Sequence, residues 1–516
     1  MAATEDYTSL VPFYTFPDRL EEQIEALRTN PLLQRMKDYR KSYDGDPHRP
    51  IYHYVNPEHT LNDPNGLCFW QGKWHLFYQA YPPEDTRQHW GHAISDDLIH
   101  WQDLPYAIYP NPERCCYSGA TLVEDDRVIA MYHGTTVGNM VAVSSDPLLL
   151  NWQKVTGQAV IPMANADGLP LPYRVFDPCI WKKDDYYYSL SGGTLPAAGH
   201  KVKRANFLFR SADLANWEYL HPFVEEDLFT LVGDDGACPY FWPIGDRHIL
   251  LFYSHMSGGQ YLLGDYDKDG DKFVVTSHDK CNFGPSNPCG VHAPSAAPDG
   301  EGNVIVIFNM NPGKPTKNWN QIMTLPRKLT LIGEEDLRVE PAGDVESLRR
   351  EHVHVEGRML PANQDVVLDQ VNGNAMEIVA EIDCKDAPMV EMNVLRSPNE
   401  EEVTRIMFFK ERGMRNRQLN LRSSLVTIDS SRSSILPDVL TRAPETASLL
   451  VDPDEKLQLR VYVDKSVVEV FVNGKQCVAV RVYPGREDSV GVSLRAQGQD
   501  SELIFLDAWQ MENIYK

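Results

Sequence analysis

A carboxylate set among amides is the stretch of this chain best suited to chemistry: Asn62, Asp63 and Asn65. Pro64 fixes its own φ and favours an extended Asp63, and Gly66 permits a tight turn. An apolar and aromatic run that is typical of two strands joined by a turn follows at once. The pattern predicts a carboxylate held rigidly at a strand entrance, with amides beside it to donate hydrogen bonds. An Asx-turn that opens a hairpin is the alternative.

Further carboxylates precede apolar runs later in the chain. Asp177 lies in the sequence Phe-Asp-Pro-Cys, and the pair Asp234 and Asp235 comes just before Ala237. Glycoside hydrolysis usually needs two carboxyl groups that face one bond, about 5–5.5 Å apart in retaining enzymes. An ordinary turn is the alternative for each of these carboxylates.

The Asp63 stretch closely resembles the sucrose-binding box of glycoside hydrolase family 32, which contains the invertases, levanases and inulinases. The resemblance continues through further motifs in the order of the family and covers roughly residues 50 to 516. These motifs are Phe77-Tyr78-Gln79, His89-Trp90-Gly91-His92, Tyr117-Ser118-Gly119-Ala120, Phe176-Asp177-Pro178, Ala237-Cys238-Pro239, Met323-Thr324-Leu325-Pro326-Arg327 and the run from Val463 to Gly474.

The resemblance implies roles for individual residues. Asp63 matches the nucleophile of the family, and Asp177 matches the aspartate that binds fructosyl hydroxyls and steadies the oxocarbenium-like transition state. Residues that match sugar contacts are Asn62, Gln79, Trp90 and Ser118. We expect Trp90 to stack on the apolar face of the sugar. Tyr240, His255 and His292 are weaker candidates for lining the same pocket.

The sequence departs from the family pattern at two positions. Phe176 replaces an arginine that normally pairs with carboxylates and contacts the sugar. Arg174 is a candidate replacement, because side chains two positions apart on a strand point to the same face. Ala237 replaces the glutamate that serves as the acid/base in the family, and alanine cannot transfer a proton.

Three explanations for Ala237 remain open at this stage. The sequence could carry an inactivating Glu-to-Ala change, the acid role could have moved to Asp235 or Asp234, or the protein could bind fructosides without hydrolysing them. The Asp-Asp-Gly sequence beside Ala237 favours the second explanation slightly. We therefore predict Asp235 as a catalytic residue and Asp234 as a substrate contact.

The order of the elements predicts an all-β protein with a short helical N-terminal extension. Between residues 50 and 335, a turn followed by an alternating aromatic and apolar strand recurs at 71–79, 125–133, 183–190, 245–255 and 300–309. Such repetition indicates a propeller, and the family resemblance independently implies five blades. A Ser-x-Asp-Leu-x-x-Trp element that recurs beside these strands is expected to close the blades.

The domain boundaries follow from changes in pattern. We expect a helical extension at 1–48, with Asp18 as a cap and a break at Pro31, and the propeller at 49–335. A linker with a helix is expected at 336–360. Short alternating strands then predict a β-sandwich at 361–516, in agreement with the family. Asp464 and Glu469 in the sandwich are expected to be structural.

Composition narrows the class of protein further. The formal net charge of −24 argues against nucleic acid as a partner, and no run is long enough to span a membrane. The nine cysteines form no C-x-x-C pair and are expected to be buried thiols. With no signal segment at the given N-terminus, a cytoplasmic location is expected. No motif suggests a cofactor or a metal, and a homo-oligomer is possible.

These observations together predict a retaining β-fructofuranosidase that acts on sucrose or fructo-oligosaccharides through Asp63. A fructosyltransferase, including one that forms a difructose anhydride, is the first alternative. A non-catalytic fructoside-binding protein is the second.

Overall fold

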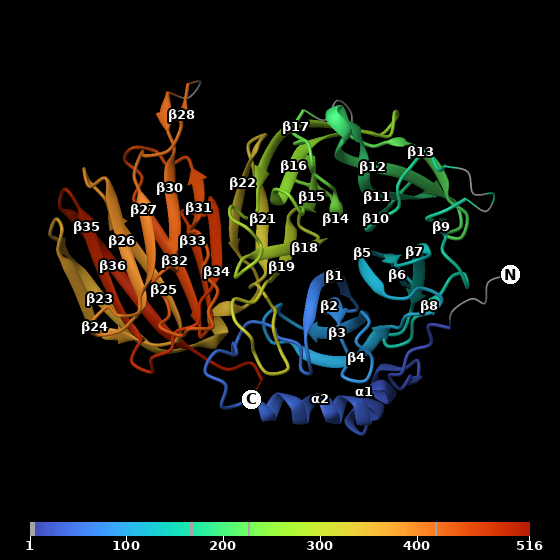
Figure 1. Cartoon of the computed structure of the whole chain (residues 1–516), viewed down its shortest axis with the longest axis horizontal. Helices are drawn as coiled ribbons and strands as arrows, with labels where there is room; N and C mark the ends of the chain where they lie inside the picture. Colours follow the sequence, from blue (N-terminus) through green and yellow to red (C-terminus); the bar gives the residue numbers. More distant parts are fainter. Residues whose placement is uncertain (1–5, 166, 168–169, 225–227, 418–419, 516) are drawn as a thin grey trace.

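Two β domains lie side by side in a computed structural model, and two helices run along the edge of the first domain (Figure 1). The structure describes residues 6–165, 167, 170–224, 228–417 and 420–515. The first domain is the predicted five-bladed propeller, and the second is the predicted sandwich.

Each blade of the propeller is an antiparallel sheet whose strands follow one another along the chain. Blade 1 contains β1 (Leu61–Trp70), β2 (Lys73–Ala80), β3 (His89–Ser95) and β4 (Gln102–Ile108). Blade 2 contains β5 (Cys116–Val123), β6 (Val128–Gly134), β7 (Gly138–Ser144), β8 (Gln153–Lys154) and β9 (Ile161–Pro162). Blade 3 contains β10 (Pro178–Lys183), β11 (Tyr186–Ala197), the single turn η1 (Ala198–His200), β12 (Lys201–Ser211) and β13 (Glu218–Pro222).

The remaining blades complete a closed ring. Blade 4 contains β14 (Ala237–Ile244), β15 (Arg247–Ser254), β16 (Gly258–Asp267) and β17 (Lys272–Lys280). Blade 5 contains β18 (Val291–Pro298), β19 (Val304–Met310), β20 (Ile322–Met323), β21 (Arg327–Ile332) and β22 (Asp336–Pro341). The first strand of every blade contacts the first strand of the next, and β18 contacts β1. These inner strands therefore surround the central axis.

The strands predicted from the repeating pattern are the second strands of the five blades. They correspond to β2, β6, β11, β15 and β19. The pattern was detectable because each second strand has sheet partners on both sides and is mostly buried.

The Ser-Asp-Leu element, predicted to be structural, forms the turn between the third and fourth strands of a blade. In blade 1, Asp97 accepts hydrogen bonds from the backbone N–H groups of Ile99 and His100. In blade 3, Asp213 bonds the two equivalent N–H groups. The element is therefore structural.

Residues 336–360 do not form the predicted linker with a helix. β22 (Asp336–Pro341) pairs with β21 as the outer strand of blade 5, and β23 (Arg349–Leu360) is already part of the sandwich. Only the single turn η2 (Val345–Leu348) lies between them. The charges at Asp336, Arg338 and Glu340 are typical of an edge strand, since they alternate with the less exposed side chains between them.

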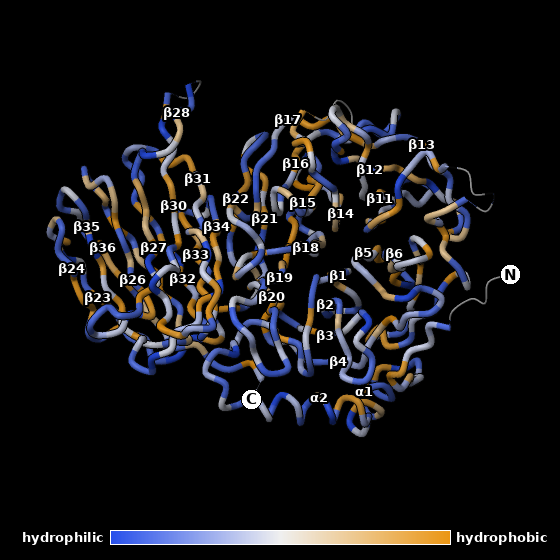
Figure 2. The backbone as a smooth tube through the Cα atoms, in the orientation of Figure 1, coloured by the Kyte–Doolittle hydropathy of each residue, from blue (hydrophilic) through white to orange (hydrophobic). Residues whose placement is uncertain are grey.

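The sandwich consists of two sheets of six strands, and its buried core is mostly aliphatic. Hydrophobic stretches occur along its strands (Figure 2). One sheet contains β23, β36 (Ser501–Met511), β25 (Ala375–Asp383), β32 (Leu457–Asp464), β33 (Val467–Val472) and β34 (Gln476–Arg481). The other contains β24 (Asp365–Asn372), β35 (Gly491–Gln497), β26 (Met389–Arg396), β27 (Thr404–Phe409), β30 (Ser424–Asp429) and β31 (Glu445–Leu449). A separate hairpin, β28 (Arg415–Asn416) and β29 (Leu421–Arg422), projects from this domain (Figure 1).

A buried charge cluster joins the two domains. The His53 ring lies between two carboxylates of the sandwich, with Nδ1 2.9 Å from Asp464 and Nε2 3.1 Å from Glu469. Arg327 of blade 5 also donates to Glu469, at 2.9 Å. Burial opposes the charge on His53, but the bonds to both carboxylates raise its pKa to about 9. The predicted structural role of Asp464 and Glu469 is confirmed.

The N-terminal extension contains α1 (Leu20–Arg28) and α2 (Pro31–Ser42). Pro31 divides the helical segment as predicted, and the Asn30 side chain caps α2 by accepting a bond from the backbone N–H of Leu33. The prediction of Asp18 as a cap is wrong, because Arg19 is the residue that precedes α1 and no side chain caps that helix. Neither described helix is long and apolar enough to cross a bilayer.

Candidate active site

Asp63 lies near the start of β1, the inner strand of blade 1. The pairing of β1 with β2 is irregular on both sides of Pro64 and Asn65, so the box bends the strand where it begins. Gly66 adopts a φ of +49°, and a Cβ there would lie 2.8 Å from Thr121. Inner strands β5, β14 and β18 show the same kind of irregularity near their starts. The sequence thus builds a bent strand entrance that presents Asp63 at the axis.

Four neighbours from four blades hold the Asp63 carboxylate. One oxygen accepts bonds from Ser118 Oγ at 2.8 Å, Gln79 Nε2 at 3.4 Å and Cys238 Sγ at 3.6 Å. The other oxygen lies 3.0 Å from Nδ1 of His292. Burial opposes ionisation, but the His292 charge and these hydrogen bonds together lower the pKa of Asp63. The carboxylate is buried, ionised and fixed, as a nucleophile requires.

Asp177 meets Asp63 at the same thiol. Its carboxylate accepts the backbone N–H of Cys238 at 3.1 Å and Cys238 Sγ at 3.5 Å. Burial, and next the charge of Asp63, raise the pKa of Asp177 to about 7. The structure therefore brings together the two carboxylates that the sequence singled out.

Cys238 is a site residue to which the sequence alone assigned no role. It adopts a φ of +49°, a strained conformation for a residue other than glycine, which turns its N–H and thiol toward the carboxylates. Burial, and next the charges of Asp177 and Asp63, raise the pKa of the thiol well above its ordinary value. The thiol therefore remains a neutral donor. The one sequence signal was its place in the motif Ala-Cys-Pro.

A chain of amides extends from Asp63 toward blade 5. Asn62 donates to Gln79 at 3.1 Å and accepts from Gln321 at 3.0 Å and Asn309 at 3.3 Å. Asn62, Gln79 and Ser118 are thus at the site as expected, although Gln79 and Ser118 are buried and hold Asp63. Sequence reasoning missed Asn309 and Gln321, because neither lies in a motif.

Two predicted sugar contacts are core residues instead. Trp90 is 0% exposed, donates to the carbonyl of Tyr117 and packs against aromatic rings. Its ring supports Gly66, so it cannot stack on a sugar. Tyr240 is also buried, and its hydroxyl bonds Ser295 and a backbone carbonyl. The Trp90 side chain lies in the packing between blades 1 and 2, whereas the Tyr240 hydroxyl joins the inner strands of blades 2 and 5.

The acidic pair before Ala237 divides into two different roles. Asp234 is fully buried and accepts bonds from the hydroxyls of Ser254 and Ser257 and from a backbone N–H. The predicted substrate contact at Asp234 is therefore wrong, since its oxygens already hold this turn. Asp235 is half-buried and bonds His255.

Arg174 does not replace the arginine that the family has in place of Phe176. Arg174 is exposed, and no ion pair of the described residues joins it to Asp63 or Asp177. The expectation fails because residue 174 precedes the strand, so that strand alternation does not apply there. Phe176 instead packs beside Ala237, Cys238 and Ala293, which makes one wall of the site apolar.

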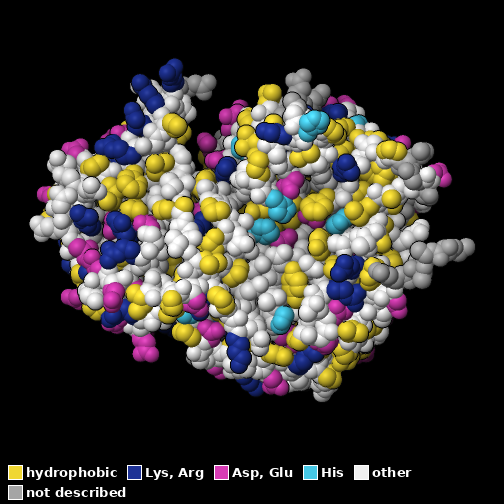
Figure 3. Space-filling model, viewed as in Figure 1, with side chains coloured by type: hydrophobic (Ala, Val, Ile, Leu, Met, Phe, Trp, Pro, Cys, Tyr) yellow, Lys and Arg dark blue, Asp and Glu magenta, His cyan; other side chains and the backbone are white. Residues whose placement is uncertain are grey.

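In the described ion pairs, a histidine and not an arginine is the partner of Asp63. Figure 3 shows histidine and acidic side chains close together near the centre of the propeller face. The rings of His292 and His255 have centroids 6.2 Å apart, with Tyr253 beside both. Among the described residues, no group of three or more His, Cys, Asp or Glu side chains is placed to hold a metal ion. The described cysteines are free thiols, and all but Cys281 are buried.

Comparison with known families and structures places this geometry in context. Residues 53–341 match the N-terminal domain of glycosyl hydrolases family 32, and residues 344–510 match the family's C-terminal domain. The chain belongs to glycosyl hydrolase family 32. The resemblance seen in the motifs is thereby confirmed, and the protein is a glycosidase.

Relatives in the family cover most of the chain. A levanase of Bacillus subtilis is 27% identical over 88% of this chain and 69% of its own length. A fructan 6-exohydrolase of Beta vulgaris is 26% identical over 92% of this chain and 89% of its own. The crystal structure of fructan 1-exohydrolase IIa from Cichorium intybus superposes with a TM-score of 0.78 at 22% identity, covering 91% of this chain and 98% of that one. This last likeness supports the family 32 fold.

Proposed function

We propose that this family 32 protein cleaves terminal β-fructosyl residues from sucrose or short fructo-oligosaccharides, with retention of configuration. One observation carries the proposal: Asp63 and Asp177 converge on the Cys238 thiol at the axis of the propeller. Relatives named levanase and fructan 6-exohydrolase support the choice of a fructoside. A neutral sugar also suits a chain with a net charge of −24.

The first step is attack by the ionised Asp63 on the anomeric carbon of the fructosyl group. A bond forms between an Asp63 oxygen and that carbon, while the bond to the departing oxygen breaks. The His292 ring beside Asp63 keeps the carboxylate ionised. Water then cleaves the fructosyl-enzyme and restores Asp63.

Asp177 binds the hydroxyls of the fructosyl group and takes no direct part in breaking the glycosidic bond. Its pKa of about 7 makes it either an acceptor or a donor for fructosyl hydroxyls near neutral pH. Negative charge on Asp63 and Asp177 stabilises the oxocarbenium-like transition state between them. The proton for the departing oxygen has to come from another group, and the sequence pointed to Asp235.

The test is to replace Asp63 by alanine and measure the release of fructose from sucrose, inulin-type sugars and levan oligomers. We expect turnover to fall by at least ~10³-fold, because no neighbouring group replaces the nucleophile. Asp126→Ala, on an exposed turn of blade 2, is the matched control and should keep full activity. Unchanged turnover in Asp63→Ala would refute the assignment.

Fructosyl transfer is a second candidate function. The apolar wall made by Phe176, Ala237 and Ala293 favours it, because such a wall can hold an acceptor sugar and exclude water. Product analysis at high sucrose concentration separates the two, since a hydrolase releases only free fructose and the leaving sugar. A non-catalytic binding protein would instead bind fructosides in calorimetry and yield no product, even as the Ala237→Glu variant.

A further inference from the structure

His255 occupies the mouth of the site and is fixed there by Asp235. It follows β15 directly, and its side chain is 60% exposed. One Asp235 oxygen accepts the backbone N–H of His255 at 3.0 Å, and the other lies 2.7 Å from ring atom Nδ1. These two bonds set the orientation of the ring. With Nδ1 bonded to a carboxylate, Nε2 is the nitrogen left for a substrate.

Cross-strand pairing brings His255 close to the place where the family has its acid. Ala237 of β14 pairs with Tyr253 of β15, and His255 follows two residues later. The His255 ring centroid is 6.2 Å from that of His292, which touches the nucleophile. The histidine therefore lies near the reacting carboxylates.

Charges around His255 favour its protonated form. The groups that face it are Asp235 before β14, Asp177 before β10, Asp63 on β1, Tyr253 on β15 and His292 on β18. The hydrogen bond to Asp235 raises the pKa of His255 against the effect of burial, and the charges of all three carboxylates act in the same direction. The raised pKa favours the imidazolium form of the ring.

We propose that the His255 imidazolium, held by Asp235, donates the proton to the departing glycosidic oxygen that Ala237 cannot supply. The inference rests on the proposed fructosidase function. In the first step, Nε2–H passes its proton to the leaving oxygen while Asp63 bonds the anomeric carbon. In the second step, the neutral ring accepts a proton from the attacking water, and the Asp63–sugar bond breaks. Asp235 is a positioning residue, since both of its oxygens bond His255.

The test compares substrates that differ in their need for a proton. In His255→Gln, we expect sucrose turnover to fall by about 10²–10⁴-fold, the usual contribution of general acid catalysis. A 4-nitrophenyl β-fructofuranoside, whose leaving group needs little proton assistance, should lose less than about tenfold. Added imidazole should partly restore sucrose turnover in His255→Ala. In Asp235→Asn, the alkaline limb of the pH–rate profile should move to lower pH.

A second histidine–carboxylate pair provides the matched control. His100 lies 2.7 Å from Asp97 on a turn of blade 1, and His100→Gln should leave both substrates unaffected. Equal turnover of sucrose by wild type and His255→Gln would overturn the inference. An equal loss on both substrates would also overturn it, because it would indicate a structural role. A wild-type protein inactive on every fructoside would refute the proposed function itself.

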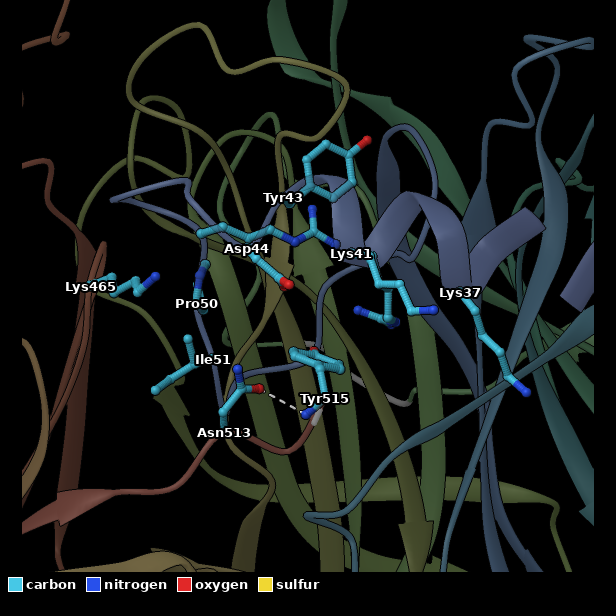
Figure 4. A pocket seen from close by; sticks show the side chains of 11 residues that line it. Lys37, Lys41, Tyr43, Asp44, Pro50, Ile51, Lys465, Asn513 and Tyr515 are labelled. Atoms are coloured by element: carbon cyan, nitrogen blue, oxygen red, sulfur yellow. Dashed lines mark hydrogen bonds between the residues drawn. The ribbon is translucent and has the colours of Figure 1, made fainter. Parts of the chain in front are cut away.

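An independent observation concerns a cavity of about 610 Å³ between α2, the C-terminal segment and the turn after β32 (Figure 4). Five cationic side chains line it, against a single carboxylate, Asp44. The cations are Lys37, Arg40, Lys41, Arg49 and Lys465. Such a concentration of positive charge is unexpected on a chain with a net charge of −24.

Arg49 is the cation of this cavity with the least compensation. It is 6% exposed, bonds the carbonyl of Asn56, and stacks on the ring of Tyr43. Its Nη1 has no hydrogen-bond partner, and no ion pair of the described residues includes Arg49. Burial, and next the charge of Arg40, lower the pKa of Arg49 to about 10. Arg40, in contrast, makes a two-bond pair with Asp103.

The geometry points to a site for a phosphoryl group, either free phosphate or a phosphate monoester. Five cations beside one carboxylate are costly without further counter-charge, and a tetrahedral oxyanion in the cavity would balance Arg49 and the lysines. Because residues of α2, of the segment 49–51 before the propeller, of the sandwich and of the C-terminal segment line the cavity, a bound anion would also hold these parts together.

Calorimetric titration of the full chain with phosphate and with glycerol phosphate tests this site, at constant ionic strength set with chloride. We expect one saturable site, which Arg49→Met abolishes and the double change Lys37→Ala with Lys41→Ala weakens at least about tenfold. The double change leaves the buried Arg49 in place and is the variant to use if Arg49→Met does not fold. The control is Lys201→Ala with Lys203→Ala on exposed positions of β12. Absence of saturable binding, or equal binding in all variants, would overturn the proposal. The ligand that binds more tightly shows whether the site takes free phosphate or a phosphate monoester.

Discussion

The same pair of residue types, a histidine and a carboxylate, occurs in two very different places in this protein. At the domain interface, His53 is 0% exposed in its side chain and both ring nitrogens are bonded to carboxylates. At the mouth of the propeller, His255 is 60% exposed and bonds its carboxylate through Nδ1 only. A histidine with two bonded nitrogens can hold domains together, whereas one with a free nitrogen can exchange a proton with a ligand.

Placing a glutamate at residue 237, where the family has its acid/base, gives the strongest test of the catalytic role of His255. We expect Ala237→Glu to raise sucrose turnover by about 10²–10⁴-fold when introduced into His255→Gln. The new carboxyl group would be buried beside Asp63 and Asp177, which raises its pKa and keeps it protonated. In the wild-type background the same change should have little effect. A large gain in wild type would indicate that His255 was not supplying the proton.

Removing the interface histidine should affect stability and not chemistry. His53→Gln leaves Asp464 and Glu469 short of a buried cation, and such changes cost about 3–5 kcal/mol. Denaturant unfolding measures the loss, while turnover of the folded fraction should match wild type. Reduced turnover per folded molecule would contradict the division between the two histidines.

The pH dependence of stability should follow His53 rather than His255. The pKa of His53 is raised to about 9 in the folded state, from about 6.5 when unfolded. Its contribution is therefore complete below about pH 6.5 and is lost as pH rises toward 9, by at most about 3 kcal/mol. Unfolding curves at several pH values should show this fall in wild type and in His255→Gln, but not in His53→Gln.

A smaller effect is expected at the nucleophile. Ser118→Ala removes a 2.8 Å bond that helps to lower the pKa of Asp63. The pKa of Asp63 should rise, so the acidic limb of the kcat/KM profile should move to higher pH. A bond to a charged group contributes about 1.5 kcal/mol or more, which corresponds to roughly tenfold in kcat/KM. An unchanged acidic limb would mean that this limb reports another group.

Features of the fold and of the site that depend on residues adjacent in the chain could be predicted from the sequence alone. The Asp63 box, the second strands of the blades, the sandwich strands and the break at Pro31 are local patterns, and the structure contains all of them. The positions of Asp63 and Asp177 at one axis also followed, because a propeller brings equivalent strand entrances together.

Tertiary structure decided what depends on a partner distant in sequence. The strand register at the start of β14 points Cys238 toward the carboxylates and leaves Asp234 in a turn. It also places Asp235 within hydrogen-bond distance of His255. Packing between blades buries Trp90 and Tyr240, although both stand in or beside motifs. Residues 336–341 form a strand because they pair with β21 at the edge of blade 5. A local pattern fixes which side chains are neighbours along a strand, but only the pairing of strands fixes what each one faces.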